Sequence, residues 1–314
     1  MTTISEIGED ALIALFAPRL PETDAEILGP GDDAAVLSVD GDLVVSSDVL
    51  VEGRHFRREW STGADVGWRA AMQNLADIDA MGAVPTALQV TLCAPGDLDV
   101  DWVLDFADGL REACAPHGVG VVGGDLSGAD QIMVSVTVIG ETHGQEVVTR
   151  ADAMPGQVVA VSAPLGAAAA GFALLSADRG AEVPEAAALF RRPRPVVGAG
   201  LEASLRGAVA MMDISDGLLR DAGRLARASE VGLALVSADV PVHPAASLAA
   251  AALGVSALPF ALTGGEDHAL LAVFPYSSAV PVGWSVIGEV TDAFSGVRVD
   301  GAVPDAVGWD HFSL

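Results

Sequence analysis

Seven short acidic segments, most of them flanked by glycine, recur along this chain of 314 residues. Several of them end apolar, strand-like runs, so they indicate tight turns at the ends of strands. The chain contains no lysine, and a carboxylate repels a phosphate unless a divalent cation stands between them. We therefore interpret the turns as a candidate site that binds phosphate groups through Mg²⁺. The segments are 31–36, 46–48, 74–77, 123–125, 213–217, 264–267 and 305–308.

Strand-like and helix-like patterns alternate along the chain, which predicts an α+β fold with two domains. A turn-forming sequence at 151–156, which contains a proline and a glycine, predicts the boundary. We therefore expect domains at 1–150 and 151–314. Strands are expected at 43–50, 87–93, 119–122, 132–140, 157–162, 209–212, 268–274 and 285–290. Helices are expected at 62–81, 100–115, 166–176 and 217–228.

The composition excludes several classes of function. The formal net charge of −27 repels nucleic acid and anionic lipid, so neither is an expected partner. Without lysine there can be no Walker A loop and no Schiff-base lysine. Cys93 and Cys114 match no metal or redox spacing, which is consistent with reduced thiols in a cytoplasmic protein. Residues 1–10 are too polar for a signal peptide, and segment 243–262, which has no Asp, Glu, Lys or Arg, predicts a buried or half-buried helix rather than a membrane span.

Segment 213–217 follows a strand and opens a helix. Ser215 is expected to cap that helix, whose free backbone N–H groups would favour an anionic oxygen. Asp213 and Asp216 could hold a cation on the same turn. Ser46, Ser47 and Asp48 add two hydroxyls and a carboxylate at a strand end, which suit a hard cation better than Zn²⁺.

The helix expected at 62–81 carries acids near its end. Asn74 and Asp77 are three residues apart and therefore share a face, whereas Asp79 is expected to face solvent. His55 lies close in sequence to the Ser46–Asp48 oxygens, which makes a contact with substrate plausible beside a purely structural role. The other histidines have no such context, and no Ser-His-Asp or Cys-His arrangement indicates covalent catalysis.

Taken in order, these segments resemble the thiamine-monophosphate kinases. That family belongs to the superfamily of aminoimidazole ribonucleotide synthetase, selenophosphate synthetase and the hydrogenase maturation dehydratase. The resemblance implies an aminoimidazole ribonucleotide synthetase-like fold, with an N-terminal mixed-sheet domain that forms a barrel in a homodimer. The C-terminal α/β domain is expected to complete the active site. The implied reaction is transfer of the γ-phosphoryl group of ATP, assisted by several Mg²⁺ ions, to thiamine monophosphate.

The resemblance also implies roles for individual residues. Expected cation ligands are Asp33, Ser46, Ser47, Asp48, Asp77, Asp125, Asp213 and Asp216. Expected ATP contacts are Gly124, Asp125, Arg150 and Ser215, and expected contacts with thiamine monophosphate are His55, Glu266 and Trp309. The chain departs from the family at three positions. Ser47 replaces a threonine, Asp79 replaces an alanine, and Ala306 stands where an aromatic residue is usual, three residues before Trp309.

Rival interpretations remain open at this point. Within the superfamily, the dehydratase requires a C-terminal cysteine, and this chain ends in the sequence 311–314, His-Phe-Ser-Leu. Selenophosphate synthetase requires an N-terminal cysteine or selenocysteine and a lysine. Aminoimidazole ribonucleotide synthetase is the best enzymatic alternative, and a non-catalytic cation- or nucleotide-binding protein is the alternative from another class.

Overall fold

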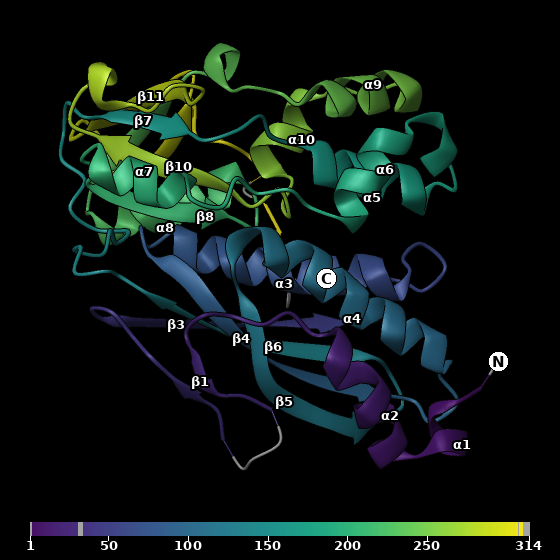
Figure 1. The fold of residues 1–314 in the computed structure, drawn as a ribbon. Helices are drawn as coiled ribbons and strands as arrows, with labels where there is room; N and C mark the ends of the chain where they lie inside the picture. Colours follow the sequence, from purple (N-terminus) through teal and green to yellow (C-terminus); the bar gives the residue numbers. More distant parts are fainter. Residues whose placement is uncertain (1, 31–33, 307, 310–314) are drawn as a thin grey trace. The chain divides into compact units, whose positions relative to one another are not determined.

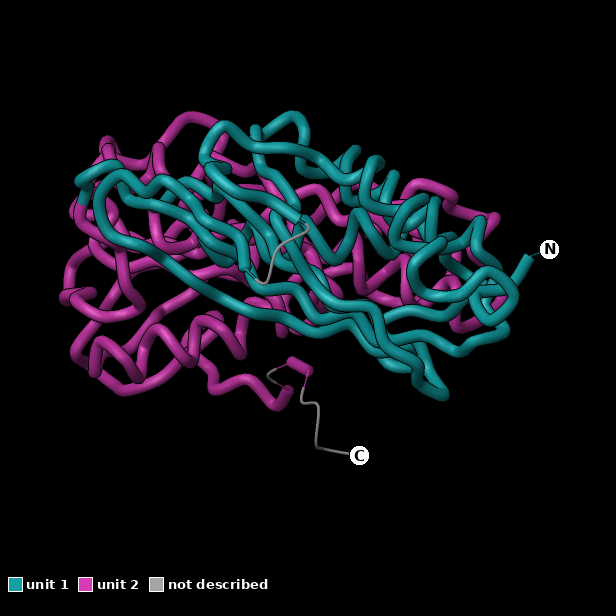
Figure 2. Tube along the Cα trace, turned by 60° about the horizontal axis from the view of Figure 1, so that its bottom comes forward, with its two compact units in different colours: residues 1–78, 83–145 teal, residues 79–82, 146–314 magenta. Residues whose placement is uncertain are grey.

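The computed structural model describes residues 2–30, 34–306 and 308–309 (Figure 1). The chain divides into two compact units, coloured separately in Figure 2. Unit 1 contains Met1–Ile78 and Ala83–Gln145, and unit 2 contains Asp79–Gly82 and Glu146–Leu314. The four residues 79–82 therefore belong to unit 2 although the chain on both sides of them belongs to unit 1.

A four-stranded mixed sheet forms the centre of unit 1. Strand β6 (Met133–Glu141) pairs antiparallel with β3 (Leu43–Val51) and with β4 (Val84–Ala94), and β4 pairs parallel with β5 (Gly120–Gly128). Burial alternates along β6, as expected for a strand with only one face on the core. All four strands were expected from their apolar patterns: β3 and β4 enclose their predicted ranges, β5 continues to Gly128, and β6 is shifted by one residue.

Helices α3 (Gly63–Asp79) and α4 (Val100–Cys114) cover one face of this sheet (Figure 1). They approach closely because glycines lie at their contact: a Cβ atom at Gly63 would collide with the carbonyl of Trp102, and one at Gly67 would collide with that of Phe106. The remaining elements of the unit are short. They are α1 (Ile4–Ile7), α2 (Glu9–Phe16), β1 (Glu26–Leu28) and β2 (Val36–Leu37), with β1 and β2 paired antiparallel.

A six-stranded sheet, in the order β12-β9-β11-β7-β10-β8, forms the centre of unit 2. Every residue of β10 is buried, because alternate side chains enter two different cores: Leu271 packs in the core that α8 covers, and Leu270 in the core that α7 covers. The strands are β7 (Val158–Val161), β8 (Ala210–Ile214), β9 (Gly232–Leu235), β10 (Ala269–Phe274), β11 (Ser285–Thr291) and β12 (Gly296–Val299). The two covering helices are α7 (Ala199–Leu205) and α8 (Leu218–Ala228).

Three alanine-rich helices of unit 2 pack together around a separate small core. They are α5 (Ala167–Ser176), α6 (Pro184–Arg191) and α9 (Pro244–Leu253). The single helix expected at 243–262 is wrong in one respect, since α9 ends at Gly254, whose φ is 72°, and α10 (Leu258–Thr263) follows separately. Within the described residues, no helix combines the length and the apolar character needed to cross a bilayer.

Candidate active site

The first group of predicted ligands lies on β3 and α3 of unit 1. Because side chains alternate along a strand, Ser46 and Asp48 share the half-buried face of β3. The hydroxyl of Ser46 donates a hydrogen bond of 2.7 Å to Oδ2 of Asp77, so the strand and the helix bring these two predicted ligands together. Ser47 lies on the opposite, exposed face of β3, and its side chain is therefore separated from those of Ser46 and Asp48.

Asn74 lies one turn before Asp77 and is completely buried. Its side-chain nitrogen donates to the carbonyl of Ala70 at 2.8 Å, but its Oδ1 has no hydrogen-bond partner among the described residues. A buried amide oxygen without a donor is unusual, because leaving such an acceptor unsatisfied costs about 1–3 kcal/mol. This oxygen is therefore a further acceptor on the helix that carries Asp77.

The segment 123–125 lies within β5, not after it as the pattern suggested. Gly124 pairs with Val90 so closely that a Cβ atom would collide with the Val90 carbonyl, which explains the glycine, and Asp125 is exposed. His55 follows β3, and its Nδ1 accepts a 3.0 Å hydrogen bond from the backbone N–H of Val51, which ties the ring to its own turn. Asp33 lies outside the described residues.

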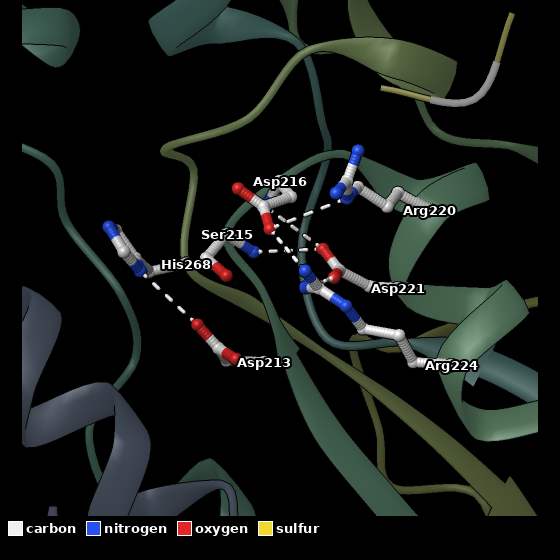
Figure 3. A network of polar contacts seen from close by, with 7 residues as sticks. All are labelled: Asp213, Ser215, Asp216, Arg220, Asp221, Arg224 and His268. Atoms are coloured by element: carbon white, nitrogen blue, oxygen red, sulfur yellow. Dashed lines mark hydrogen bonds and ion pairs between the residues drawn. The ribbon is translucent and has the colours of Figure 1, made fainter. Parts of the chain in front are cut away.

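In unit 2 the turn between β8 and α8 carries Asp213 and Asp216 (Figure 3). The expected cap at Ser215 is wrong, because α8 begins at Leu218 with Gly217 as its N-cap. Instead Asp221, inside α8, reaches back and accepts hydrogen bonds from the backbone N–H groups of Ser215, at 3.1 Å, and Asp216, at 3.0 Å. A carboxylate of the helix thus orders the turn that precedes it.

Two arginines of α8 form ion pairs with the acids of this turn and of the helix. Arg224 donates to Asp221 and to Asp216, each at 2.6 Å, and Arg220 lies 3.7 Å from Asp216 (Figure 3). Burial, followed by the negative charge of Asp213, raises the pKa of Asp221 to about 6, against the hydrogen bond from Asp216 and the charge of Arg224. The sequence held a signal for Asp221, since the residue falls in the apolar stripe of α8 between Leu218 and Leu225.

Asp213 lies beside His268, which no sequence pattern had indicated as a site residue. His268 is buried, its Nδ1 lies 3.4 Å from Oδ2 of Asp213, and its Nε2 lies 3.6 Å from Oε2 of Glu266. Burial alone would lower the pKa of His268, but the hydrogen bonds and charges of Asp213 and Glu266 outweigh burial and raise it to about 10. The predicted cation ligand and the predicted substrate contact therefore share one imidazole.

Asp267 has a structural role beside Glu266. Its carboxylate accepts hydrogen bonds from the backbone N–H groups of Gly166, at 2.5 Å, and Ala168, at 2.9 Å, at the beginning of α5. Desolvation raises the pKa of Asp267 to about 6, against the lowering effect of these hydrogen bonds. The acid thus caps α5 and fixes the loop that carries Glu266.

Asp79 does not face solvent as expected. It is 2% exposed, and its Oδ1 accepts hydrogen bonds of 3.0 Å from the backbone N–H groups of Gly198 and Gly200. These groups open α7, whose own N-cap, Gly198, has no side chain, so the acid at the end of α3 caps a helix distant in sequence. Burial raises the pKa of Asp79 from 3.8 to about 6, although the hydrogen bonds from Gly200 and Gly198 lower it.

The remaining predicted contacts lie at different places in unit 2. The backbone N–H of Trp309 donates to the carbonyl of Asp216 at 2.9 Å, which places this half-exposed residue on the acidic turn. Ala306 is exposed. Arg150 is also exposed and lies beside the first residues of β8, where the carbonyl of Thr149 accepts from the N–H of Met211.

Over the described ranges, no three His, Cys, Asp or Glu side chains converge into a ready-made metal site. One pair of predicted ligands is brought together, Ser46 with Asp77, and the predicted ligand Asp213 lies beside His268, which was not predicted. Pairs of oxygen ligands cannot enclose a cation, but they can hold one whose other ligands are phosphate oxygens and water.

Comparison with known proteins shows similarity over almost the whole chain. The family model for AIR synthase related protein, N-terminal domain, matches residues 31–142, and the model for the C-terminal domain matches residues 154–300. The thiamine-monophosphate kinase of Mycobacterium tuberculosis is 44% identical over 99% of this chain and 93% of its own length. The thiamine-monophosphate kinase of Aquifex aeolicus is 35% identical over 98% of this chain and 99% of its own length. A solved structure described as AaThiL complexed with AMPPCP and TMP superposes with a TM-score of 0.79, at 32% identity and 99% coverage of both chains.

Proposed function

The chain belongs to the thiamine-monophosphate kinase family, and we propose that its aspartate-bearing turns serve that family's reaction by binding phosphates through Mg²⁺. The enzyme has an AIR synthase-like fold with N- and C-terminal domains, and it phosphorylates thiamine monophosphate to thiamine diphosphate at the expense of ATP. The observation that carries this function is the 44% identity to a thiamine-monophosphate kinase over 99% of the chain.

Mg²⁺ fits the donor atoms that the acidic turns present. Ser46, Asp48 and Asp77 supply only oxygen, and the buried Oδ1 of Asn74 is an acceptor without a protein donor among the described residues. Mg²⁺ in nucleotide sites takes one or two carboxylates and completes its shell with phosphates and water, so it needs no cluster of three acids. When bound, the cation offsets the charge of the phosphates. We assign several Mg²⁺ ions to these turns, with Asp33, Ser46, Ser47, Asp48, Asp77, Asp125, Asp213 and Asp216 as their ligands.

The residues of the chain would mainly position the two substrates. The phosphate of thiamine monophosphate is largely ionised near neutral pH, so the transfer needs no strong general base. We assign Gly124, Asp125, Arg150 and Ser215 to ATP, and the guanidinium of Arg150 is the donor among them suited to a phosphate. We assign His55, Glu266 and Trp309 to thiamine monophosphate, where the carboxylate of Glu266 would attract the cationic thiazolium ring.

We also propose a homodimer formed through β3. Three apolar side chains on one face of this strand, Leu43, Val45 and Val49, are between 43% and 55% exposed. Exposed apolar side chains gathered on one face of a sheet, here interrupted only by Ser47, are typical of an interaction surface. Light scattering should therefore give twice the chain mass of 31.8 kDa.

We propose a cytoplasmic location as well. Cys93 and Cys114 are both free cysteines, which suits a reducing compartment. ATP, the phosphoryl donor, is a substrate of that compartment.

A charge-removing series tests the assignment of the acids. Asp48→Asn and Asp213→Asn should each reduce turnover at least about 100-fold at limiting Mg²⁺, because each removes a cation ligand and little volume. Asp105→Asn, the same change at an exposed acid of α4, should leave turnover unchanged. Near-normal activity of either site variant at limiting Mg²⁺ would show that its acid does not bind the cation.

A further inference from the structure

His268 lies between two carboxylates that have different proposed tasks. Its Nδ1 lies 3.4 Å from Asp213, assigned above to the cation, and its Nε2 lies 3.6 Å from Glu266, assigned above to thiamine monophosphate. The imidazole side chain is 5% exposed, so the ring itself is shielded from bulk water. Figure 3 shows the ring beside Asp213, directed away from Asp216 and its arginines.

The backbone around His268 gives the ring little freedom to move. Its N–H donates to the carbonyl of Ile214 at 3.1 Å, and the N–H of Glu266 donates to the carbonyl of Ser215 at 2.9 Å. Asp267, between them, is held at the beginning of α5 by its two hydrogen bonds. Glu266 and His268 both have positive φ values, 73° and 53°, which side chains other than glycine seldom adopt. The loop is thus fastened to β8 and to α5 on either side of the ring.

The side chain of Glu266 has more conformational freedom than that of Asp213. Its side chain is 32% exposed, whereas that of Asp213 is 8% exposed and lies in a buried strand. An exposed glutamate samples several rotamers, and holding it in one of them for binding costs side-chain entropy. The buried Nε2 of His268 has no hydrogen-bond partner among the described residues and lies 3.6 Å from Oε2 of Glu266, so it favours the rotamers that keep this carboxylate beside the ring and reduces that cost before substrate arrives.

We propose that His268 is a positioning residue for thiamine monophosphate, holding Glu266 in its substrate-binding orientation by bridging it to Asp213. This inference rests on the proposed assignment of Glu266 to that substrate. It goes beyond the assignment because it names the group that orients Glu266 and connects the substrate contact to the cation contact through one side chain.

The bridge predicts a selective kinetic effect. His268→Phe keeps a planar ring at this position and removes both ring nitrogens, so the KM for thiamine monophosphate should rise about tenfold, as loss of one oriented charged contact implies. The KM for ATP should change less than about twofold. His268→Gln can still donate to one carboxylate and should restore part of the affinity.

A double-mutant cycle with Glu266→Gln distinguishes positioning from packing. In the Glu266→Gln background, His268→Phe should raise the KM for thiamine monophosphate less than about twofold, because the bridged carboxylate is already gone. Equal effects of His268→Phe in both backgrounds would overturn the proposal. His243→Phe is the matched control: His243 caps α9 through a 3.1 Å hydrogen bond from Ala245 N–H, so its loss should lower the melting temperature and leave both KM values unchanged.

A second readout does not require turnover. In ¹⁵N nuclear magnetic resonance spectra of the ligand-free protein, Glu266→Gln should shift the Nε2 signal of His268 and leave the Nδ1 signal in place. Asp213→Asn should do the reverse. If neither substitution moves the ring signals, the bridge does not exist and the proposal fails. If the wild-type enzyme releases no ADP in response to thiamine monophosphate while the ring signals respond as expected, the proposed function fails and the bridge is a structural one.

Discussion

The buried carboxylate of Asp79 gives a prediction with a definite sign and size. Burial raises its pKa from 3.8 to about 6, so the folded protein holds this proton more tightly than the unfolded chain does. Each pH unit between the two values corresponds to about 1.4 kcal/mol, so ionised Asp79 costs the folded state about 3 kcal/mol at pH 7.5. This cost therefore begins to disappear as the pH falls through 6, and it is fully absent only below pH 3.8.

Asp79→Asn should remove that cost and keep the helix cap. The Oδ1 atom accepts from both Gly198 and Gly200, and the amide oxygen of asparagine can accept the same two hydrogen bonds. The variant should therefore be about 3 kcal/mol more stable than the wild type at pH 7.5. At pH 5.0, one unit below the folded-state pKa, the difference should shrink to about half. Asp221 and Asp267 titrate in the same range but are present in both proteins, so their contributions cancel.

Asp79→Ala is the informative contrast. It removes the charge and also leaves the N–H groups of Gly198 and Gly200 without their acceptor, which costs about 2–6 kcal/mol for the pair. Urea unfolding followed by circular dichroism at pH 7.5 and 5.0 measures all three proteins. Hydrogen exchange of the amides in α7 provides a local readout, which should show faster exchange in the alanine variant alone. A stability difference between wild type and Asp79→Asn that is the same at both pH values would refute the reasoning.

Two further predictions concern the turn between β8 and α8. Asp221→Asn keeps an acceptor for the N–H groups of Ser215 and Asp216 but removes the charge that Arg224 shares, so Arg224 should pair more fully with Asp216. The Mg²⁺ concentration for half-maximal activity should rise several-fold, and an unchanged Mg²⁺ titration would contradict this. Trp309→Ala should raise the KM for thiamine monophosphate more than that for ATP, whereas equal effects would mark the half-exposed ring as structural.

Much of the fold follows from periodicity. The helix expected at 100–115 is observed as Val100–Cys114, and the strand expected at 285–290 as Ser285–Thr291, because each has an apolar pattern of the correct period and a clear end. The number of helices in segment 243–262 did not follow from periodicity, because an alanine-rich sequence fits one helix or two equally well. The αL glycine at 254 decides between them only once α9 has a core to pack against.

Site residues could be predicted where their own residue types and near neighbours in sequence indicate the chemistry. They could not be predicted where their role depends on partners that are distant in sequence. The hydroxyls and the acid of segment 46–48 were recognised from their residue types, although they lie inside β3 and not at its end. The burial of Asp79 was not predictable, because its partners lie about 120 residues away in sequence and are backbone N–H groups that no residue type reveals. His268 was not predicted for the same reason, because only the pairing of β10 with β8 brings it beside Asp213.

The central claim is that this chain phosphorylates the phosphate of thiamine monophosphate and does not phosphorylate a hydroxyl. The most direct test is ³¹P nuclear magnetic resonance of the products formed from ATP and Mg²⁺, with thiamine monophosphate or free thiamine as acceptor. The account predicts the two coupled resonances of thiamine diphosphate with thiamine monophosphate, and no phosphorylated product with free thiamine. Formation of thiamine monophosphate from thiamine, or ADP release that does not depend on either acceptor, would contradict it.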